Sequence, residues 1–119
     1  MQQVSVKQVV IEALEDVKGI QVTCLDVTQQ TDITDYMIIV SGTSNRHVKA
    51  LAGNVVVDAK AAGFVPIGVE GMEDAEWVLI DLADVVVHVM LPAARDFYDI
   101  ERLWSMGPVN KEESAVIEH

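Results

Sequence analysis

The stretch Glu70–Met90, EGMEDAEWVLIDLADVVVHVM, decides the fold of this 119-residue chain. It contains two runs, Trp77–Leu82 and Val85–Met90, that are rich in β-branched and apolar residues. Only Ala83 and Asp84 separate these runs, and such a short connection is typical of a β-hairpin. We therefore predict an antiparallel hairpin that follows a polar loop.

Apolar periodicity predicts the other elements on both sides of the hairpin. Apolar residues at helical spacing predict helices over 4–17 and 44–62, and a last helix that begins at Pro92. Extended apolar runs predict strands over 22–27, 36–40 and 64–69. The run at 36–40 is continuously apolar, so we expect both of its faces to be covered. Proline cannot donate to a ladder, so we expect the strand that contains Pro66 to lie at an edge.

The ends and the buried side of the helices can also be predicted. Gly19 and Gly63 follow the first two helices, at a position where a residue with positive φ is usual. Thr43 or Ser44 is expected to cap the second helix. The last helix is expected to bury one side, formed by Ala94, Phe97, Ile100, Leu103 and Trp104.

These elements together predict one α/β domain, with a mixed sheet of about five strands and flanking helices. A chain of this length is long enough for one domain with its own core. We expect the domain to span residues 1–105. Residues 106–119 show no helical stripe, and we expect them to form a disordered tail.

The composition suits a cytoplasmic globular protein. Half of the residues are apolar, but no apolar run approaches the ~20 residues of a membrane span. The first residues lack the pattern of a secretory signal. Cys24 is the only cysteine and cannot form an internal disulfide, so we expect a reducing compartment. It lies in an apolar run, and we expect it to be a buried core residue.

The net charge of −11 limits the classes of partner. An acidic surface is repelled by phosphate backbones, so we expect no direct binding to DNA. Near nucleic acid, such a protein should contact a basic protein and not the nucleic acid itself. The charge could also serve solubility alone, and the sequence leaves these two interpretations open.

Three groups of residues raise the question of catalysis. Residues 42–44, Gly-Thr-Ser, follow a strand and open a helix, where backbone amides can hold an anion, as in nucleotidyltransferases. The next strand carries no carboxylate for a metal, so helix capping is the better interpretation. Asp32 and Asp35 fit turn chemistry better than a metal site. His47 and His88 lack further ligands for zinc. We therefore predict no catalytic residue, no metal and no cofactor.

Trp77 stands next to an acidic loop that contains Glu70, Glu73, Asp74 and Glu76. An aromatic residue beside carboxylates suits a contact with a basic protein surface, and Trp is a frequent hot-spot residue in interfaces. On the residues alone, a place in the core is the favoured interpretation of Trp77.

Many short motifs of the chain, in order and with compatible spacing, are similar to those of one known family. They are residues 33–37, 42–44, 46–48 and 66–71, Trp77, Asp81, residues 84–90, Arg95, residues 97–98 and residues 101–104. Across residues 4 to 105 the chain resembles the ribosomal silencing factors, also called the Iojap-like family. Alanine stands at position 83, where the family usually has glycine. If that position needs positive φ, alanine costs about 1 kcal/mol.

The resemblance implies a fold similar to nucleotidyltransferases and a function without catalysis. Such proteins bind the large ribosomal subunit through ribosomal protein fourteen and block joining of the small subunit, which lowers translation when nutrients are scarce. The resulting hypothesis places the contact on the hairpin and its loop, at Glu70, Trp77, Asp81, Leu82, Asp84, His88 and Met90. Trp77 and Leu82 would be apolar anchors, although strand alternation puts them on opposite sides. The carboxylates would face basic residues.

Two other functions remain open at this stage. One is a nucleotide-handling enzyme on the same fold, with its nucleotide near Ser44. The other is a homodimeric adaptor, in which an apolar edge of the hairpin supports self-association. The resemblance also implies that a homodimer can form when the protein is off the ribosome.

Overall fold

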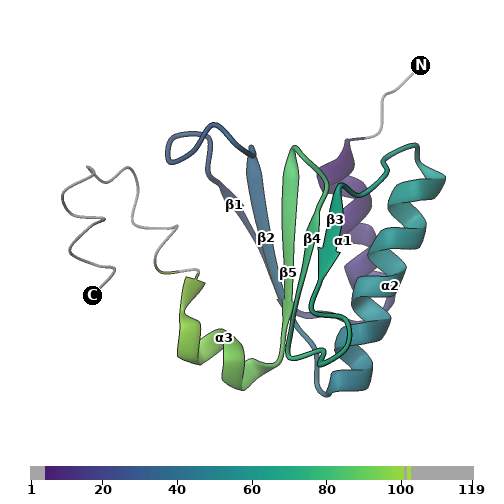
Figure 1. Cartoon of the computed structure of the whole chain (residues 1–119), viewed down its shortest axis with the longest axis vertical. Coiled ribbons are helices and arrows are strands. Elements are labelled where there is room, and N and C mark those ends of the chain that lie inside the picture. The colour runs from purple at the N-terminus through teal and green to yellow at the C-terminus, as the bar shows by residue number, and fades with distance from the viewer. Residues whose placement is uncertain (1–4, 101, 103–119) are drawn as a thin grey trace.

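The predicted hairpin is present, as strands β4 (Trp77–Asp81) and β5 (Val85–Met90), in a computed structural model that describes residues 5–100 and 102. The hairpin belongs to a five-stranded sheet of order β1-β2-β5-β4-β3 (Figure 1). The other elements are α1 (Val6–Asp16), β1 (Ile20–Asp26), β2 (Tyr36–Ser41), α2 (Asn45–Ala61), β3 (Gly68–Glu70) and α3 (Pro92–Tyr98). The predicted order of helices and strands is confirmed.

The sheet is mixed, as the sequence predicts. Strands β2 and β5 pair in parallel, with Ile39 opposite His88, whereas all the other neighbouring strands are antiparallel. The parallel pair is possible because α2, β3 and β4 lie between β2 and β5 in the chain and provide the long crossover that parallel strands need. Strand β2 lies inside the sheet and is buried along almost its whole length, so the prediction of two covered faces is confirmed.

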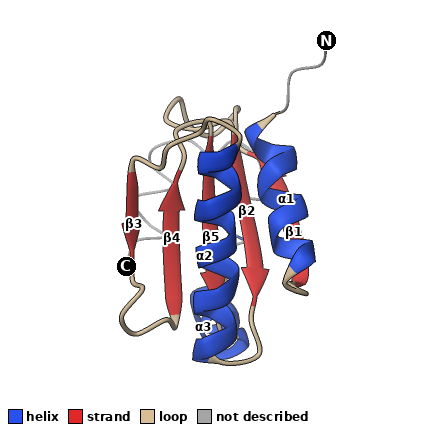
Figure 2. Cartoon of the chain, turned by 90° about the vertical axis from the view of Figure 1, so that its right-hand side faces the viewer, coloured by secondary structure: helices blue, strands red, loops and turns tan. Residues whose placement is uncertain are grey.

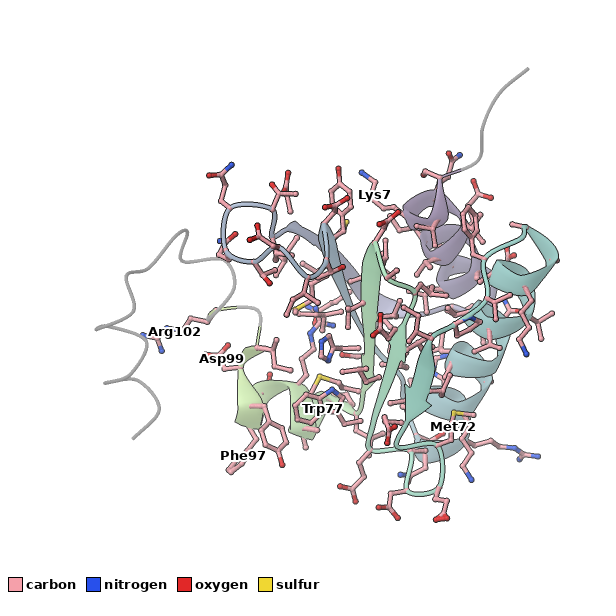
Figure 3. The ribbon with its side chains drawn as sticks, turned by 45° about the horizontal axis from the view of Figure 1, so that its top comes forward. Lys7, Met72, Trp77, Phe97, Asp99 and Arg102 are labelled. Atoms are coloured by element: carbon pink, nitrogen blue, oxygen red, sulfur yellow. The ribbon has the colours of Figure 1, made fainter. Side chains whose placement is uncertain are left out.

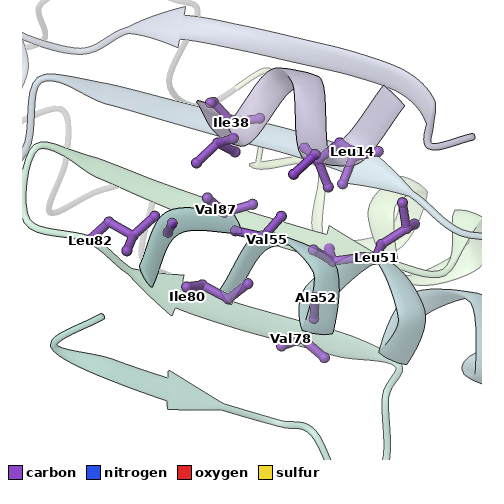
Figure 4. Close-up of a cluster of buried hydrophobic side chains, with 14 of the residues drawn as sticks. Leu14, Ile38, Leu51, Ala52, Val55, Val78, Ile80, Leu82 and Val87 are labelled. Carbon is purple, nitrogen blue, oxygen red and sulfur yellow. The ribbon is translucent and has the colours of Figure 1, made fainter. Parts of the chain in front are cut away.

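One face of the sheet carries the main core. Helices α1 and α2 lie side by side over this face (Figure 2). Leu14 of α1 and Val55 of α2 are fully buried there together with Ile38 and Val87 of the strands (Figure 4). Each such side chain contributes about 1.5–3 kcal/mol when it leaves water. We call this side of the sheet the helix face.

The helix ends confirm most of the predicted caps and correct one. Ser44 caps α2 by accepting a hydrogen bond from the amide of His47, and Gly63 has a φ of 95°. The prediction for Gly19 is wrong, because Lys18 takes the positive φ after α1. Gly19 is needed for space instead: a Cβ there would lie 2.6 Å from the side chain of Val40.

The other side of the sheet, which we call the open face, is covered at one end by α3 (Figure 1). Pro92 begins α3 as predicted. Arg95 is buried beneath the helix, whereas Phe97, predicted to be buried, is 81% exposed. Phe97 is exposed because α3 is short and buries only the side that carries Arg95. Leu103, Trp104 and the predicted tail lie outside the described residues.

Two further expectations about the edges need correction. Strand β3 is an edge strand as predicted, but it begins only at Gly68, two residues after Pro66. Cys24 is exposed and not buried, because it lies on β1, the opposite edge strand of the sheet. No helix within the described part of the chain is long and apolar enough to cross a membrane.

Candidate partner-binding face

The strand register gathers several predicted site residues on the open face. Leu79 pairs with His88, and Asp81 pairs with Val86, so these four side chains point to the same side of the hairpin. Glu70 of β3 pairs with Leu79 and shares that side. Leu79 and Val86 therefore form an apolar floor on the open face. The carboxylates of Asp81 and Glu70 lie beside this floor, toward the edge of the sheet formed by β3.

Trp77 connects the open face to α3. Its indole Nε1–H donates a hydrogen bond to Nδ1 of His88, at 2.8 Å. The centre of its ring lies 4.7 Å from that of Tyr98, which is 5.0 Å from the ring of Phe97. We call Trp77, Phe97 and Tyr98 the aromatic cluster; Trp77 and Phe97 both lie on the α3 side of the sheet (Figure 3). Trp77 is half-buried, so it belongs partly to the core and partly to the surface.

His88 is one of the few buried polar residues, with 5% of its surface exposed. Burial disfavours the charged imidazole and lowers the pKa of His88 to about 4. The ring is therefore neutral near pH 7. Because Nδ1 accepts the bond from Trp77, the proton of the neutral ring sits on Nε2, which has no hydrogen-bond partner within residues 5–100 and 102.

A hollow of about 390 Å³ lies over this part of the sheet, and Trp77 and His88 both line it. Most of its wall is apolar, from Ile33, Met37, Leu79, Val86 and Ile100. Ile33, in the loop before β2, is 85% exposed. An exposed apolar side chain beside an apolar hollow is typical of a contact surface.

Two of the predicted contact residues pack in the hydrophobic core of the structure. Leu82 is 6% exposed and packs in the helix-face core, on the side of the hairpin away from Trp77. Met90 is fully buried on the open face, beneath Trp77 and Ala94. Leu82 and Met90 therefore stabilise the hairpin by packing in its core. Asp84 is exposed in the hairpin turn, where Ala83 has a φ of 71°.

The Gly-Thr-Ser turn at 42–44 is occupied by the chain's own side chains. The amide of Thr43 donates to Nδ1 of His47 at 2.9 Å, and the amide of His47 donates to Ser44 Oγ. A Cβ on Gly42 would lie 2.9 Å from Val48, so glycine is required there for close packing. The capping interpretation is confirmed, and these two amides are already used.

Threonines beside Asp32 and Asp35 make turn contacts, and His47 makes a contact between helices. In the loop before β2, the Thr31 hydroxyl accepts a bond from the amide of Ile33, and Thr34 donates to the carbonyl of Tyr36. His47 Nε2 lies 2.7 Å from the carbonyl of Val17 and ties α2 to the end of α1. No group of three potential metal ligands occurs within the described residues.

The fold and this face define a small α/β domain whose distinctive surface is one side of its mixed sheet. The family model described as "Ribosomal silencing factor during starvation" matches residues 2–119. The chain belongs to this family of ribosomal silencing factors.

Individual relatives agree with the family match. A ribosomal silencing factor from Chromobacterium violaceum is 54% identical over 99 residues, which cover 83% of this chain and 81% of the relative. A crystal structure of a protein from the same organism has a TM-score of 0.84 at 52% identity, and the match covers 88% of each chain. A mouse relative named mitochondrial assembly of ribosomal large subunit protein 1 is 33% identical, over 69% of this chain and 37% of the relative.

Sequence reasoning missed three residues of this face. The sequence predicts that Phe97 is buried, indicates no contact for Tyr98, and shows Ile33 only as part of a motif. For Phe97 and Tyr98 the sequence gives no decisive signal, because adjacent helix positions can both be buried, as Leu51 and Ala52 of α2 are. For Ile33 no signal was available, since its role depends on how its loop lies over the sheet.

Proposed function

We propose that this protein silences ribosomes by binding the large subunit through ribosomal protein fourteen. Bound there, it blocks the approach of the small subunit and lowers translation when nutrients are scarce. The proposed role requires no catalysis and places the protein with the ribosomes in the cytoplasm. The observation that carries the proposal is the open face, on which Trp77 of the aromatic cluster shares one side of the sheet with Glu70 and Asp81 in a chain of this family.

Charge supports a basic protein as the direct contact. The net charge of −11 favours approach to a basic protein surface, whereas ribosomal RNA around that surface repels any misplaced orientation. The carboxylates lie at the side of an apolar floor, which resembles the apolar centre and polar rim of protein interfaces. The large-subunit name of the mouse relative is consistent with this choice of subunit.

Trp77 provides the first experiment. We expect Trp77→Ala to weaken binding to purified large subunits at least tenfold, because partly buried Trp residues at interfaces contribute on the order of 2–4 kcal/mol. Binding can be measured by cosedimentation with the subunits. Val57→Ser is a matched control, since Val57 is 62% exposed on α2, on the other side of the sheet.

Folding is measured in parallel by urea unfolding. If Trp77→Ala unfolds, Phe97→Ser tests the same surface, because an 81% exposed side chain contributes little to the core. Wild-type protein that does not travel with large subunits would overturn the proposal. So would folded variants of the aromatic cluster that bind as tightly as the wild type.

A further inference from the structure

The hollow on the open face has a donor beneath its apolar wall. The Nε2–H group of His88 is buried and has no hydrogen-bond partner among the residues that the structure describes, although His88 lines the hollow. A buried donor without a partner costs about 1–3 kcal/mol, and such groups are rare in native proteins. The bond between Trp77 and Nδ1 fixes the ring, so His88 cannot turn to satisfy Nε2 elsewhere without losing that bond.

The surroundings of this donor restrict the acceptor that it can take. Asp81 and Glu70 lie on the same face, in register with Val86 and Leu79 of the apolar floor. A carboxylate or phosphate entering the hollow would be repelled by these side chains. A neutral carbonyl oxygen would not be repelled and can accept the hydrogen bond from Nε2. Basic groups next to that carbonyl would contact the carboxylates of Asp81 and Glu70.

From these features we infer that the hollow takes an apolar side chain of the protein partner, together with a backbone carbonyl that accepts a hydrogen bond from His88 Nε2. The neighbouring basic residues of that partner segment contact Glu70 and Asp81. The inference rests on the proposed function, since it describes the chemistry of the same contact. His88 thus contacts the partner through one nitrogen and holds Trp77 with the other.

The two parts of this contact depend on each other. In the unbound protein, Nε2 of His88 is buried away from water. The side chains that cover Nε2 must therefore move aside when the partner's carbonyl enters the hollow. An occupant that fills the hollow without an acceptor leaves the donor unpaired, and its affinity suffers for that reason. The hollow should therefore select partner segments that place a carbonyl oxygen within reach of His88 Nε2.

Two substitutions at one position separate the roles of the two nitrogens. The side-chain amide of His88→Asn lies near Nδ1, so it can still accept from Trp77 but cannot reach the Nε2 position. The amide of His88→Gln lies near Nε2 and can donate there. We expect His88→Asn to weaken large-subunit binding about tenfold, and His88→Gln to stay within about threefold of the wild type.

A purely structural role for His88 predicts the opposite order, because only His88→Asn keeps the bond to Trp77. Unfolding in urea is followed for both variants. Wild-type affinity for His88→Asn, or weaker binding by His88→Gln than by His88→Asn, would overturn the inference while the proposed function stands. A wild-type protein that does not bind subunits overturns the proposed function and, with it, this choice of partner.

A measurement on the wild-type protein covers the case in which the variants do not fold. N-methylisovaleramide combines a branched apolar group with a neutral carbonyl, and isovalerate has the same skeleton with a carboxylate. In nitrogen–proton NMR we expect the amide to shift the His88 Nε2–H and Trp77 Nε1–H signals. Equal shifts with isovalerate, or none with the amide, would count against the inferred acceptor.

Discussion

Ala83 shows at the scale of one residue how backbone strain enters the hairpin. Its φ of 71° lies in the left-handed region, which costs a residue with a Cβ about 1 kcal/mol relative to glycine. The amide of Ala83 donates to Asp81 Oδ1 at 2.9 Å, so the turn is held in this conformation. The strain expected from the sequence is therefore present.

We predict that Ala83→Gly raises the free energy of unfolding by about 0.5–1 kcal/mol, since glycine removes the strain but gains freedom in the unfolded chain. Urea denaturation measures the change. The matched control is Ala50→Gly, on an exposed position inside α2, where the same substitution should lower stability by about 1 kcal/mol. Destabilisation in both variants would show that the turn does not need positive φ.

His88 gives a second prediction at this scale, for the dependence of stability on pH. Its pKa is about 4 in the folded chain and 6.5 in the unfolded chain, so between these values the unfolded state binds the proton. Stability from this group is fully present above pH 6.5 and falls as pH decreases toward 4, by up to about 3 kcal/mol. His88→Gln should lack this component when unfolding is measured across that range.

The carboxylates also titrate at the lower end of this range. The difference between the wild type and His88→Gln isolates the histidine, because both proteins carry the same carboxylates. Parallel pH curves for the two proteins would contradict a neutral, buried His88.

Sequence alone predicted the chemistry of single residues better than their exposure. The capping role of Ser44 and the left-handed φ of Gly63 follow from local backbone rules, and both are present. The exposure of Cys24 and the burial of Met90 depend instead on which strands lie at edges and where α3 packs. Strand order is set by contacts between distant parts of the chain, which periodicity does not reveal.

At the scale of elements, α3 depends on one buried side chain. The Arg95 guanidinium donates to Ser41 Oγ at 2.9 Å and to Thr23 Oγ1 at 3.0 Å, and so connects the helix to β1 and β2. A helix of seven residues is too short to be stable alone. Arg95 therefore helps to hold the helix that carries two of the three aromatic-cluster residues.

We predict that Arg95→Met lowers the free energy of unfolding by about 2 kcal/mol, because it removes charge-assisted bonds from a buried site. Relative to the wild type, hydrogen exchange in Arg95→Met should become faster in α3 than in α2. Arg46→Met is the matched control, since Arg46 is exposed at the start of α2. Equal stability of Arg95→Met and Arg46→Met would contradict this role for Arg95.

The elements themselves were predictable where their local signals were strong. The hairpin and α2 have uninterrupted apolar patterns and clear end signals, and their predicted bounds agree with the structure within a few residues. Strand β3 is shorter than the sequence predicts, since it begins at Gly68, although the amide of Ile67 still donates to the carbonyl of Asp81 at 2.7 Å. The side chains of Val65 and Ile67 are largely exposed in the structure.

At the scale of the whole molecule, charge should control association with the ribosome. A protein with net charge −11 that meets a basic protein surface is attracted over a distance that salt shortens. We predict that raising the salt concentration slows association with large subunits more than it speeds dissociation. Stopped-flow fluorescence with a labelled protein would measure both rates, and association that is insensitive to salt would contradict electrostatic steering.

A subunit-joining assay measures the step that this protein is proposed to block. Purified large and small subunits are mixed with this protein, and intact ribosomes are followed by sucrose-gradient sedimentation. We predict that the protein travels with the large subunits and that intact ribosomes fail to form, whereas Trp77→Ala allows them to form. A protein that stays at the top of the gradient while joining proceeds normally would contradict the account.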